Sequence, residues 1–497
     1  MTPPPGSLPG RAGTSRGLRG GVVTLMGSAG SLAIQLVALV ILSRLLTPGD
    51  FGIVAMAAVF IALASLLRDF GLPTVGLQMR TLSRQQASNL FWMNLGVAFL
   101  AAAALVCCTP LLVLLYSEPR LAVVVPAMAV VVLLGGAGSQ IQVQLARQMR
   151  FGLLAVSDIA IQFVGLVVAI VLAASGAGYW ALIAQSVLAA ALSLAVRWIA
   201  ARWRPVAFRR GFGARDMART GTHYGMAQLL TFAQSNIDTL VIGAQLGATQ
   251  LGYYSRAYQS LTAPAGRLLD PLTQVVISTL NRVKTEGGDP SRVLRRIAFL
   301  LGFGLTTVFA TSAGVAPLLL PILLGNQWEP AIPVFQILAI GGCFVVLNHI
   351  SYWLFITYER SRDLLRYNLV SKPLAVALMI GGVQFGITGV AWAYVVAVAL
   401  SWPLNLVWLR RSAGIPTAPF AATGLRVLGG GVLTAFAAAW VSTALSDAGT
   451  GGAIALGAGV LTGLVTATLV AMLLPTSRAD LRTWMASGGA AMRGSGV

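Results

Sequence analysis

The chain has 497 residues, of which 57% are hydrophobic and only 10% are charged. A water-soluble globular protein carries about 25% charged residues, so this composition excludes that class and indicates a protein surrounded by lipid. The formal net charge of +20 does not indicate nucleic-acid binding, because the arginines lie in short segments between apolar stretches, as membrane topology requires. The three cysteines have neither metal-site nor disulfide spacing. We therefore expect no metal site, no catalytic residues and no enzyme activity.

Apolar stretches follow one another along the chain from Val22 to Leu474. Each is continuous and close to the roughly 20 residues that a helix needs to cross a bilayer core about 30 Å thick, whereas barrel strands would alternate over about ten residues. The sequence therefore predicts an all-α integral membrane protein with about 14 transmembrane helices. We expect these helices over residues 20–43, 51–70, 88–115, 121–145, 153–175, 178–200, 221–246, 254–281, 297–321, 331–356, 368–386, 387–409, 424–446 and 452–474.

The basic residues predict the orientation of these helices. Of the 34 lysines and arginines, 30 lie in the two terminal tails and in every second connection. Arg44, Arg120 and Arg256 lie near the opposite connections, and Arg267 falls within a predicted span. By the positive-inside rule both termini are therefore cytoplasmic. The opposite connections are too short to hold a folded domain, so we expect function to reside between the helices.

Two short motifs recur at an offset of about 200 residues. Leu46-Thr-Pro-Gly-Asp-Phe51-Gly52 matches Leu246-Gly-Ala-Thr-Gln-Leu251-Gly252, and Gly176-Ala-Gly-Tyr-Trp-Ala-Leu182 resembles Gly386-Ile-Thr-Gly-Val-Ala-Trp392. Parallel repeats of this kind are typical of transporters that move two halves around a central site. We therefore expect two six-helix halves related by a pseudo-two-fold axis. The predicted parts are a disordered cytoplasmic tail over 1–19, the halves 20–210 and 211–411, two additional C-terminal transmembrane helices within 412–476, and a cytoplasmic tail over 477–497.

Several motifs resemble one family of membrane proteins. Ser43-Arg-Leu-Leu-Thr-Pro-Gly-Asp-Phe-Gly52 and Leu67-Arg-Asp-Phe-Gly-Leu72 resemble the opening of the polysaccharide transporter (PST) family, the Wzx-like flippases. Arg150-Phe151, Trp203-Arg-Pro205, Asn236-Ile-Asp238 and Leu251-Gly-Tyr-Tyr254 are similar to the same family, so the resemblance covers roughly residues 20–410. It implies the fold of the MOP superfamily, which MATE drug exporters and MurJ-type lipid II flippases share.

The resemblance also implies a substrate and partners. The substrate would be an oligosaccharide repeat unit on undecaprenyl pyrophosphate, moved from the cytoplasmic to the periplasmic leaflet of a bacterial inner membrane for exopolysaccharide, capsule or O-antigen biosynthesis. Membrane lipids, a polysaccharide polymerase and chain-length machinery are the other implied partners. No cofactor is expected: Lys284 and Lys372 follow Val283 and Ser371, so the Gly-Lys-[Ser/Thr] ending of an ATP-binding P-loop is absent. Transport would then draw on an ion gradient or on removal of the product.

Such a substrate needs cations for its phosphates, and arginine donates to phosphate with a bidentate fork. Arg267 is the best candidate, because it lies near the middle of the predicted span 254–281. A charge there costs about 2.5–3.5 kcal/mol on insertion scales, and charges retained against that cost usually face a cavity. Asp270 follows three residues later, and Asp238 lies at a comparable depth in the preceding span. We expect these carboxylates either to handle protons or ions, or to pair with Arg267 and hold the two helices together.

A second group of candidates lies elsewhere in the chain. Arg68 and Asp69 end the second predicted span, where Arg68 would either bind the substrate or extend to the cytoplasmic edge of the membrane. Asn236 and Gln234 would bond sugar hydroxyls or hold helices together. Asp158 would carry protons or cap a helix.

Three other functions remain open at this point. A MATE-like ion-coupled exporter and a lipid II flippase share the implied fold, although a central arginine suits an anionic substrate. An integral-membrane polysaccharide polymerase or ligase belongs to a different class, and the short connections on the periplasmic side argue against it.

Overall fold

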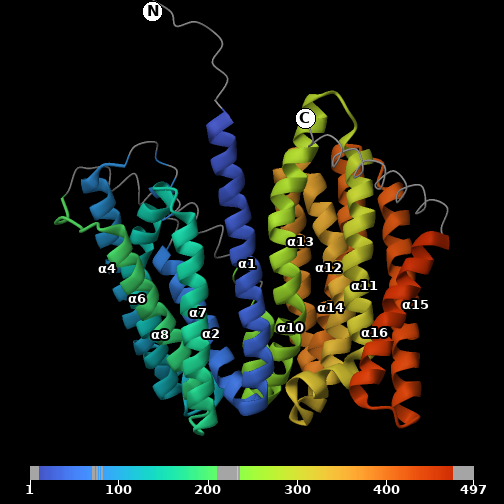
Figure 1. Cartoon of the computed structure of the whole chain (residues 1–497), viewed down its shortest axis with the longest axis horizontal. Coiled ribbons are helices and arrows are strands. Elements are labelled where there is room, and N and C mark those ends of the chain that lie inside the picture. Colours follow the sequence, from blue (N-terminus) through green and yellow to red (C-terminus); the bar gives the residue numbers. More distant parts are fainter. Residues whose placement is uncertain are drawn as a thin grey trace, which may run out of the picture. The chain divides into compact units, whose positions relative to one another are not determined.

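A computed structural model describes residues 11–69, 73, 76–77, 79, 82–209, 232 and 236–473 (Figure 1). Within these ranges, the description leaves out the side chains of residues 11–26, 28, 151, 262–265, 267–268, 270–271, 274, 361 and 413. All regular elements in the described part of the chain are helices, and the chain divides into two compact units, Met1–Gly252 and Tyr253–Val497.

The first unit is a bundle of long helices. They are α1 (Arg11–Leu45), α2 (Pro48–Asp69), α4 (Arg84–Cys107), the short α5 (Thr109–Tyr116), α6 (Leu121–Arg147), α7 (Phe151–Ala174), α8 (Trp180–Ala201) and the beginning of α10 (Ile237–Thr285). Helices α2, α4 and α6 contact one another, α8 packs on α6 and α7, and α1 packs on α7. The three-helix contact of α2, α4 and α6 encloses the site described below.

The second unit contains the rest of α10, with α11 (Pro290–Leu324), η1 (Asn326–Ala331), α12 (Ile332–Thr357), α13 (Ser361–Gly382), η2 (Val383–Phe385), α14 (Gly386–Ala413), α15 (Ala418–Asp447) and α16 (Gly452–Leu473). Helix α11 contacts α12, α15 and α16, while α14 contacts α12 and α13. The two C-terminal helices therefore pack on α11.

Glycines allow α11, α15 and α16 to approach closely. A Cβ at Gly314 of α11 would lie 2.5 Å from the carbonyl oxygen of Ala435 on α15, and a Cβ at Gly463 of α16 would lie 2.5 Å from Oγ1 of Thr311 on α11. Small residues are favoured at helix contacts in lipid because packing replaces the hydrophobic driving force there. The C-terminal pair is thus an integral part of the second unit.

The predicted class, an all-α membrane protein, is confirmed. Ten stretches of the described chain are long and apolar enough to cross a membrane, and one of them, Arg362–Ser412, contains both α13 and α14. Helix α1 begins at Arg11, nine residues before the expected start. No proline lies between Pro9 and Pro48, so every residue of this helix has a backbone N–H that can donate a hydrogen bond. The span expected over 88–115 is broken at Cys108, because Pro110 opens a new helix, α5.

The repeated motifs meet in a reciprocal contact within the first unit. A Cβ at Gly52 would collide with the carbonyl oxygen of Ala248, and a Cβ at Gly252 would collide with that of Pro48. These pairs are related by the offset of 200 residues seen in the sequence. Only glycine permits so close an approach of two backbones. The glycines of the two motifs are therefore required by packing.

Asp50 of the same motif joins it to the second motif. Its Oδ1 accepts a hydrogen bond from the backbone N–H of Tyr179 at 3.1 Å, and its Oδ2 accepts from the N–H of Thr47 at 2.9 Å and from its hydroxyl at 2.7 Å. Gly178 lies beside this carboxylate with φ +55°, a conformation that favours glycine. The motif residues that carry the family resemblance thus stabilise one end of the unit.

The segment after α8 is held along α4. The backbone N–H of Val206 donates to Ser88 Oγ at 3.0 Å, and the carbonyl oxygens of Val206 and Ala207 accept from Trp92 Nε1 at 2.9 Å and Gln85 Nε2 at 2.8 Å. The buried amide of Asn89 bonds both the N–H and the C=O of Arg209. Side chains of α4 therefore supply the backbone partners that a helix or sheet would otherwise give.

Candidate functional site

Arg68 reaches the middle of the first unit. It lies in the last turn of α2, and a long helical side chain points back toward the N-terminus of its own helix. Its Nη1 lies 3.4 Å from the carbonyl oxygen of Val132, and a Cβ at Gly135 would collide with the same nitrogen. Gly135 lies roughly midway along α6, about 20 Å from either end at 1.5 Å per residue. The guanidinium is thus inside the bundle and does not extend to the end of α2.

Asp69 holds this guanidinium with a bidentate ion pair. The Nε of Arg68 donates to Asp69 Oδ1 at 2.9 Å and its Nη2 donates to Oδ2 at 2.7 Å. The side chain of Arg68 is 13% exposed and that of Asp69 is 39% exposed. The pair therefore has a buried cation and a more accessible anion. An anion of similar geometry, such as a phosphate, could replace the carboxylate on the same edge of the fork.

Polar side chains outside the set predicted from the sequence lie on α4 and α6 near Arg68. A Cβ at Gly136 would be 3.4 Å from Arg68 Cδ and 3.3 Å from the backbone oxygen of Asn94 on α4. The Nδ2 of Asn94 lies 3.4 Å from Ser139 Oγ on α6, and Gln140 follows Ser139. Asn94 and Gln140 are both fully buried. Polar residues inside apolar spans are the sequence signal that could have found them.

The structure tests the other predicted residues only in part. Asp238 is buried in the first turn of α10, and its Oδ1 accepts from the N–H of Thr239 at 2.8 Å. Asn236 donates from Nδ2 to the carbonyl oxygen of Phe232 at 2.9 Å. Gln234 and the side chains of Arg267 and Asp270 lie outside the described residues, so the pairing of Asp238 with Arg267 stays a prediction.

Asp158 forms an ion pair within the first unit. Its Oδ1 accepts from Arg197 Nη2 at 2.9 Å, and Arg197 Nη1 also donates to Gln142 Oε1 at 3.0 Å. The Arg197 side chain is 16% exposed and that of Asp158 is 43% exposed. This pair closely matches Arg68–Asp69 in burial and joins α7 to α8. Among the described residues, no group of three His, Cys, Asp or Glu side chains could hold a metal ion.

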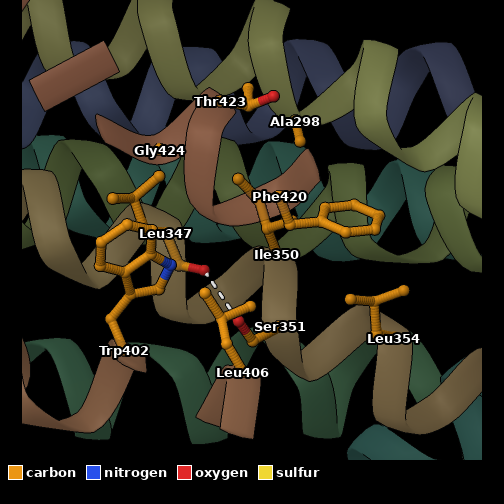
Figure 2. A pocket seen from close by; sticks show the side chains of 10 residues that line it. All are labelled: Ala298, Leu347, Ile350, Ser351, Leu354, Trp402, Leu406, Phe420, Thr423 and Gly424. Atoms are coloured by element: carbon orange, nitrogen blue, oxygen red, sulfur yellow. Dashed lines mark hydrogen bonds between the residues drawn. The ribbon is translucent and has the colours of Figure 1, made fainter. Parts of the chain in front are cut away.

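A small cavity in the second unit is lined from α11, α12, α14 and α15 (Figure 2). Its volume is about 10 Å³, which is about one water molecule. Figure 2 shows Ser351 on its wall, and the hydroxyl of this residue donates to the carbonyl oxygen of Leu347 at 3.3 Å. The cavity is too small for an oligosaccharide and mostly apolar, so Arg68 and its neighbours form the stronger candidate site.

The sequence matches a known protein family. A family model described as "Polysaccharide biosynthesis protein" matches residues 41–333. The lipopolysaccharide biosynthesis protein WzxC of Escherichia coli (strain K12) is 21% identical over 379 residues, which are 73% of this chain and 74% of WzxC. The succinoglycan biosynthesis transport protein ExoT of Rhizobium meliloti (strain 1021) is 25% identical over 403 residues, which are 76% of this chain and 80% of ExoT.

Solved structures share the fold at low sequence identity. The lipid II flippase MurJ in an inward closed conformation superposes with a TM-score of 0.68 and 12% identity, over 91% of this chain and 98% of MurJ. An inward-facing multidrug resistance transporter of the MATE family, a member of the MOP superfamily, gives a TM-score of 0.55 with 14% identity, over 79% of this chain and 95% of that one. The expected transporter fold is confirmed, and with its ten apolar stretches the chain is a multi-pass membrane protein.

Proposed function

Because the chain belongs to the polysaccharide biosynthesis protein family, we propose that it moves oligosaccharide repeat units linked to undecaprenyl pyrophosphate across the bacterial inner membrane. The protein acts by alternating access, with both termini in the cytoplasm, and it supplies units to a polysaccharide polymerase and its chain-length machinery. It is a transporter and not an enzyme. The names of WzxC and ExoT, which place those relatives in polysaccharide biosynthesis, support this substrate class.

The observation that carries the proposal at the residue level is the buried guanidinium of Arg68. An anionic headgroup must pass through a region that excludes charge, so it needs a fixed cation on its path. Arg68 is placed at mid-length of α6 by the glycine at position 135. Asp69 keeps its charge balanced until a phosphate takes the place of the carboxylate. In this proposal Arg267, Asn236 and Gln234 also contact the substrate, and Asp238, Asp270 and Asp69 handle ions or pair with the arginines.

Deletion of the gene should abolish a surface or secreted polysaccharide and cause lipid-linked repeat units to accumulate inside the cell. Normal polymer with altered drug resistance would instead favour a MATE-like exporter, and a cell-wall defect would favour a lipid II flippase. Complementation of the deletion then tests Arg68. We expect Arg68→Gln to reduce transport about 10- to 100-fold, as loss of a charged hydrogen bond predicts. Arg68→Lys should recover only part, because lysine lacks the fork.

Arg197→Gln is the matched control, since Arg197 forms an ion pair of nearly the same burial in the same unit. The amount of each variant in the membrane is measured alongside transport. Equal losses of transport in Arg68→Gln and Arg197→Gln, in step with losses of protein, would show that Arg68 acts only in stability.

A further inference from the structure

One face of α6, here called the track, leads from the contact with Arg68 to the polar side chains of Ser139 and Gln140. Val132, Gly135, Gly136, Ser139 and Gln140 recur at intervals of three and four residues, so they lie on one side of the helix. The first three positions receive the Arg68 side chain, and Ser139 contacts Asn94 of α4. The track therefore leads from the guanidinium of Arg68 to the carboxamide of Gln140 within about one helical turn, roughly 6 Å.

Two carboxamides, one on this track and one on the adjacent α4, have hydrogen-bonding atoms without partners in the described part of the chain. Gln140 is fully buried, and neither its Oε1 nor its Nε2 has a hydrogen-bond partner among the residues that the structure describes. Asn94 is also fully buried, and its Oδ1 has no hydrogen-bond partner within the described ranges. Nearly all buried polar groups in proteins are paired, and each exception requires an explanation such as a ligand or a water molecule. These three atoms belong to Gln140 and to Asn94, which contacts the preceding residue Ser139, and they indicate a group that both donates and accepts hydrogen bonds.

The chemistry of these atoms selects the ligand. The two oxygens accept hydrogen bonds and the Gln140 nitrogen donates them, so a phosphate, which only accepts, fits poorly. A cation fits poorly as well, because Arg68 supplies a positive charge nearby and Asp69 already binds that arginine. A hydroxyl group both donates and accepts, and the ring hydroxyls of a sugar offer several of them side by side.

We propose that Gln140 and Asn94 form a hydroxyl-binding subsite for the sugar attached directly to the pyrophosphate. Arg68 binds the phosphate, and the track on α6 binds the first sugar ring. The distance along α6 between these two contacts is of the order of the length of one sugar ring. The inference rests on the proposed function, because it assigns a further part of the same substrate to residues beside Arg68. It makes Gln140 a specificity-determining residue.

The test uses purified full-length protein in lipid nanodiscs and two probes. One probe is the lipid-linked saccharide that accumulates in the deletion strain, and the other is undecaprenyl pyrophosphate without sugar. We expect the wild-type protein to bind the saccharide-bearing lipid more tightly. Gln140→Met keeps an unbranched side chain but removes the amide, and it should lower this preference about three- to tenfold, the value of one hydrogen bond. Binding of undecaprenyl pyrophosphate should be unchanged.

Thermal unfolding separates the subsite from a structural role. Because the Gln140 side chain makes no hydrogen bond to any described residue, Gln140→Met should leave the midpoint of unfolding equal or raised. Gln336→Met is the control, since the Nε2 of Gln336 donates to Ala313 O at 3.1 Å and its loss should lower the midpoint without changing the preference. If Gln140→Met does not accumulate, Gln140→Leu carries the same readout.

Each outcome has one meaning. An unchanged preference in the Gln140 variants would overturn the inference and leave only water at these amides. If Arg68→Gln also bound both lipids normally, or if no lipid-linked saccharide accumulated in the deletion strain, the proposed function itself would fail. Both proposals are supported if the Gln140 variants lose the preference for the saccharide-bearing lipid and Arg68→Gln loses binding of both lipids.

Discussion

Arg68 shows how the direction of one side chain decides its environment. Its backbone ends a helix, yet its guanidinium lies at mid-length of the neighbouring α6. The reason is the backward tilt of helical side chains together with the missing Cβ at Gly135. An alanine at position 135 would displace the guanidinium and with it the ion pair to Asp69.

Glu118 provides a pH-dependent contribution at the connection between α5 and α6. Arg120 donates from Nε and Nη2 to the two carboxylate oxygens at 2.7 and 2.9 Å, and these hydrogen bonds lower the pKa of Glu118 below its ordinary value. A lowered pKa in the folded state stabilises the fold above the ordinary pKa, and this contribution is lost as the pH falls through the folded value.

Glu118→Gln should therefore lower the unfolding midpoint at pH 7 by about 2 °C at most, since ion pairs with a solvent-exposed partner such as Arg120 contribute up to about 1 kcal/mol. The difference between variant and wild type should disappear near pH 3. Glu286→Gln is the control, because Glu286 pairs with Arg282 on a fully solvated surface. A difference that persists at pH 3 would assign the effect to packing.

The sequence predicts individual site residues mainly where a charged residue interrupts an apolar stretch. A charge inside an apolar stretch is visible in the sequence, and it predicts Arg68, Asp69 and Asp238 as candidates. The partner of Arg68 on α6 is 64 residues away, and no local pattern records that contact. Gln140 is one of several polar residues within spans, and only the packing shows that its amide has no hydrogen-bond partner among the described residues.

The contact of α11 with α15 gives a prediction at the level of elements. Gly314→Ala would place a methyl group 2.5 Å from the carbonyl oxygen of Ala435, and such overpacking costs about 1–3 kcal/mol. Gly304→Ala on the same helix meets nothing within 4 Å and should be neutral or slightly stabilising. Thermal unfolding of both variants measures the difference. Equal midpoints would show that α15 does not press on α11.

Hydropathy predicts where the helices lie, but it does not predict where a helix is interrupted or how a connecting segment packs. The break at Cys108 depends on Pro110, which hydropathy treats as a minor change within an apolar run. The extended segment 204–209 has no pattern of its own, because its partners Gln85, Ser88, Asn89 and Trp92 lie on α4, more than 100 residues earlier. Such pairings are properties of the folded chain.

The topology of the whole molecule can be measured directly. Reporter fusions after residues 210, 288, 364 and 480 should report the cytoplasm, and fusions after 118, 177, 249 and 327 should report the periplasm. The reason is the distribution of the basic residues, 30 of 34 of which lie in the two tails and in one set of connections. A cytoplasmic signal after residue 249 would contradict the number of spans and the parallel repeat.

The contacts of Gly52 and Gly252 are arranged as in the interface of a symmetric homodimer. Position 52 meets 248 and position 252 meets 48, so each surface meets a copy of its own partner surface, 200 residues along the chain. This is the arrangement of an isologous interface with two-fold symmetry, here formed inside one polypeptide. A half-length chain bearing a single copy of the motif would present both sides of that interface, and two such chains would close on each other. The duplicated glycine is therefore the internal counterpart of a subunit contact.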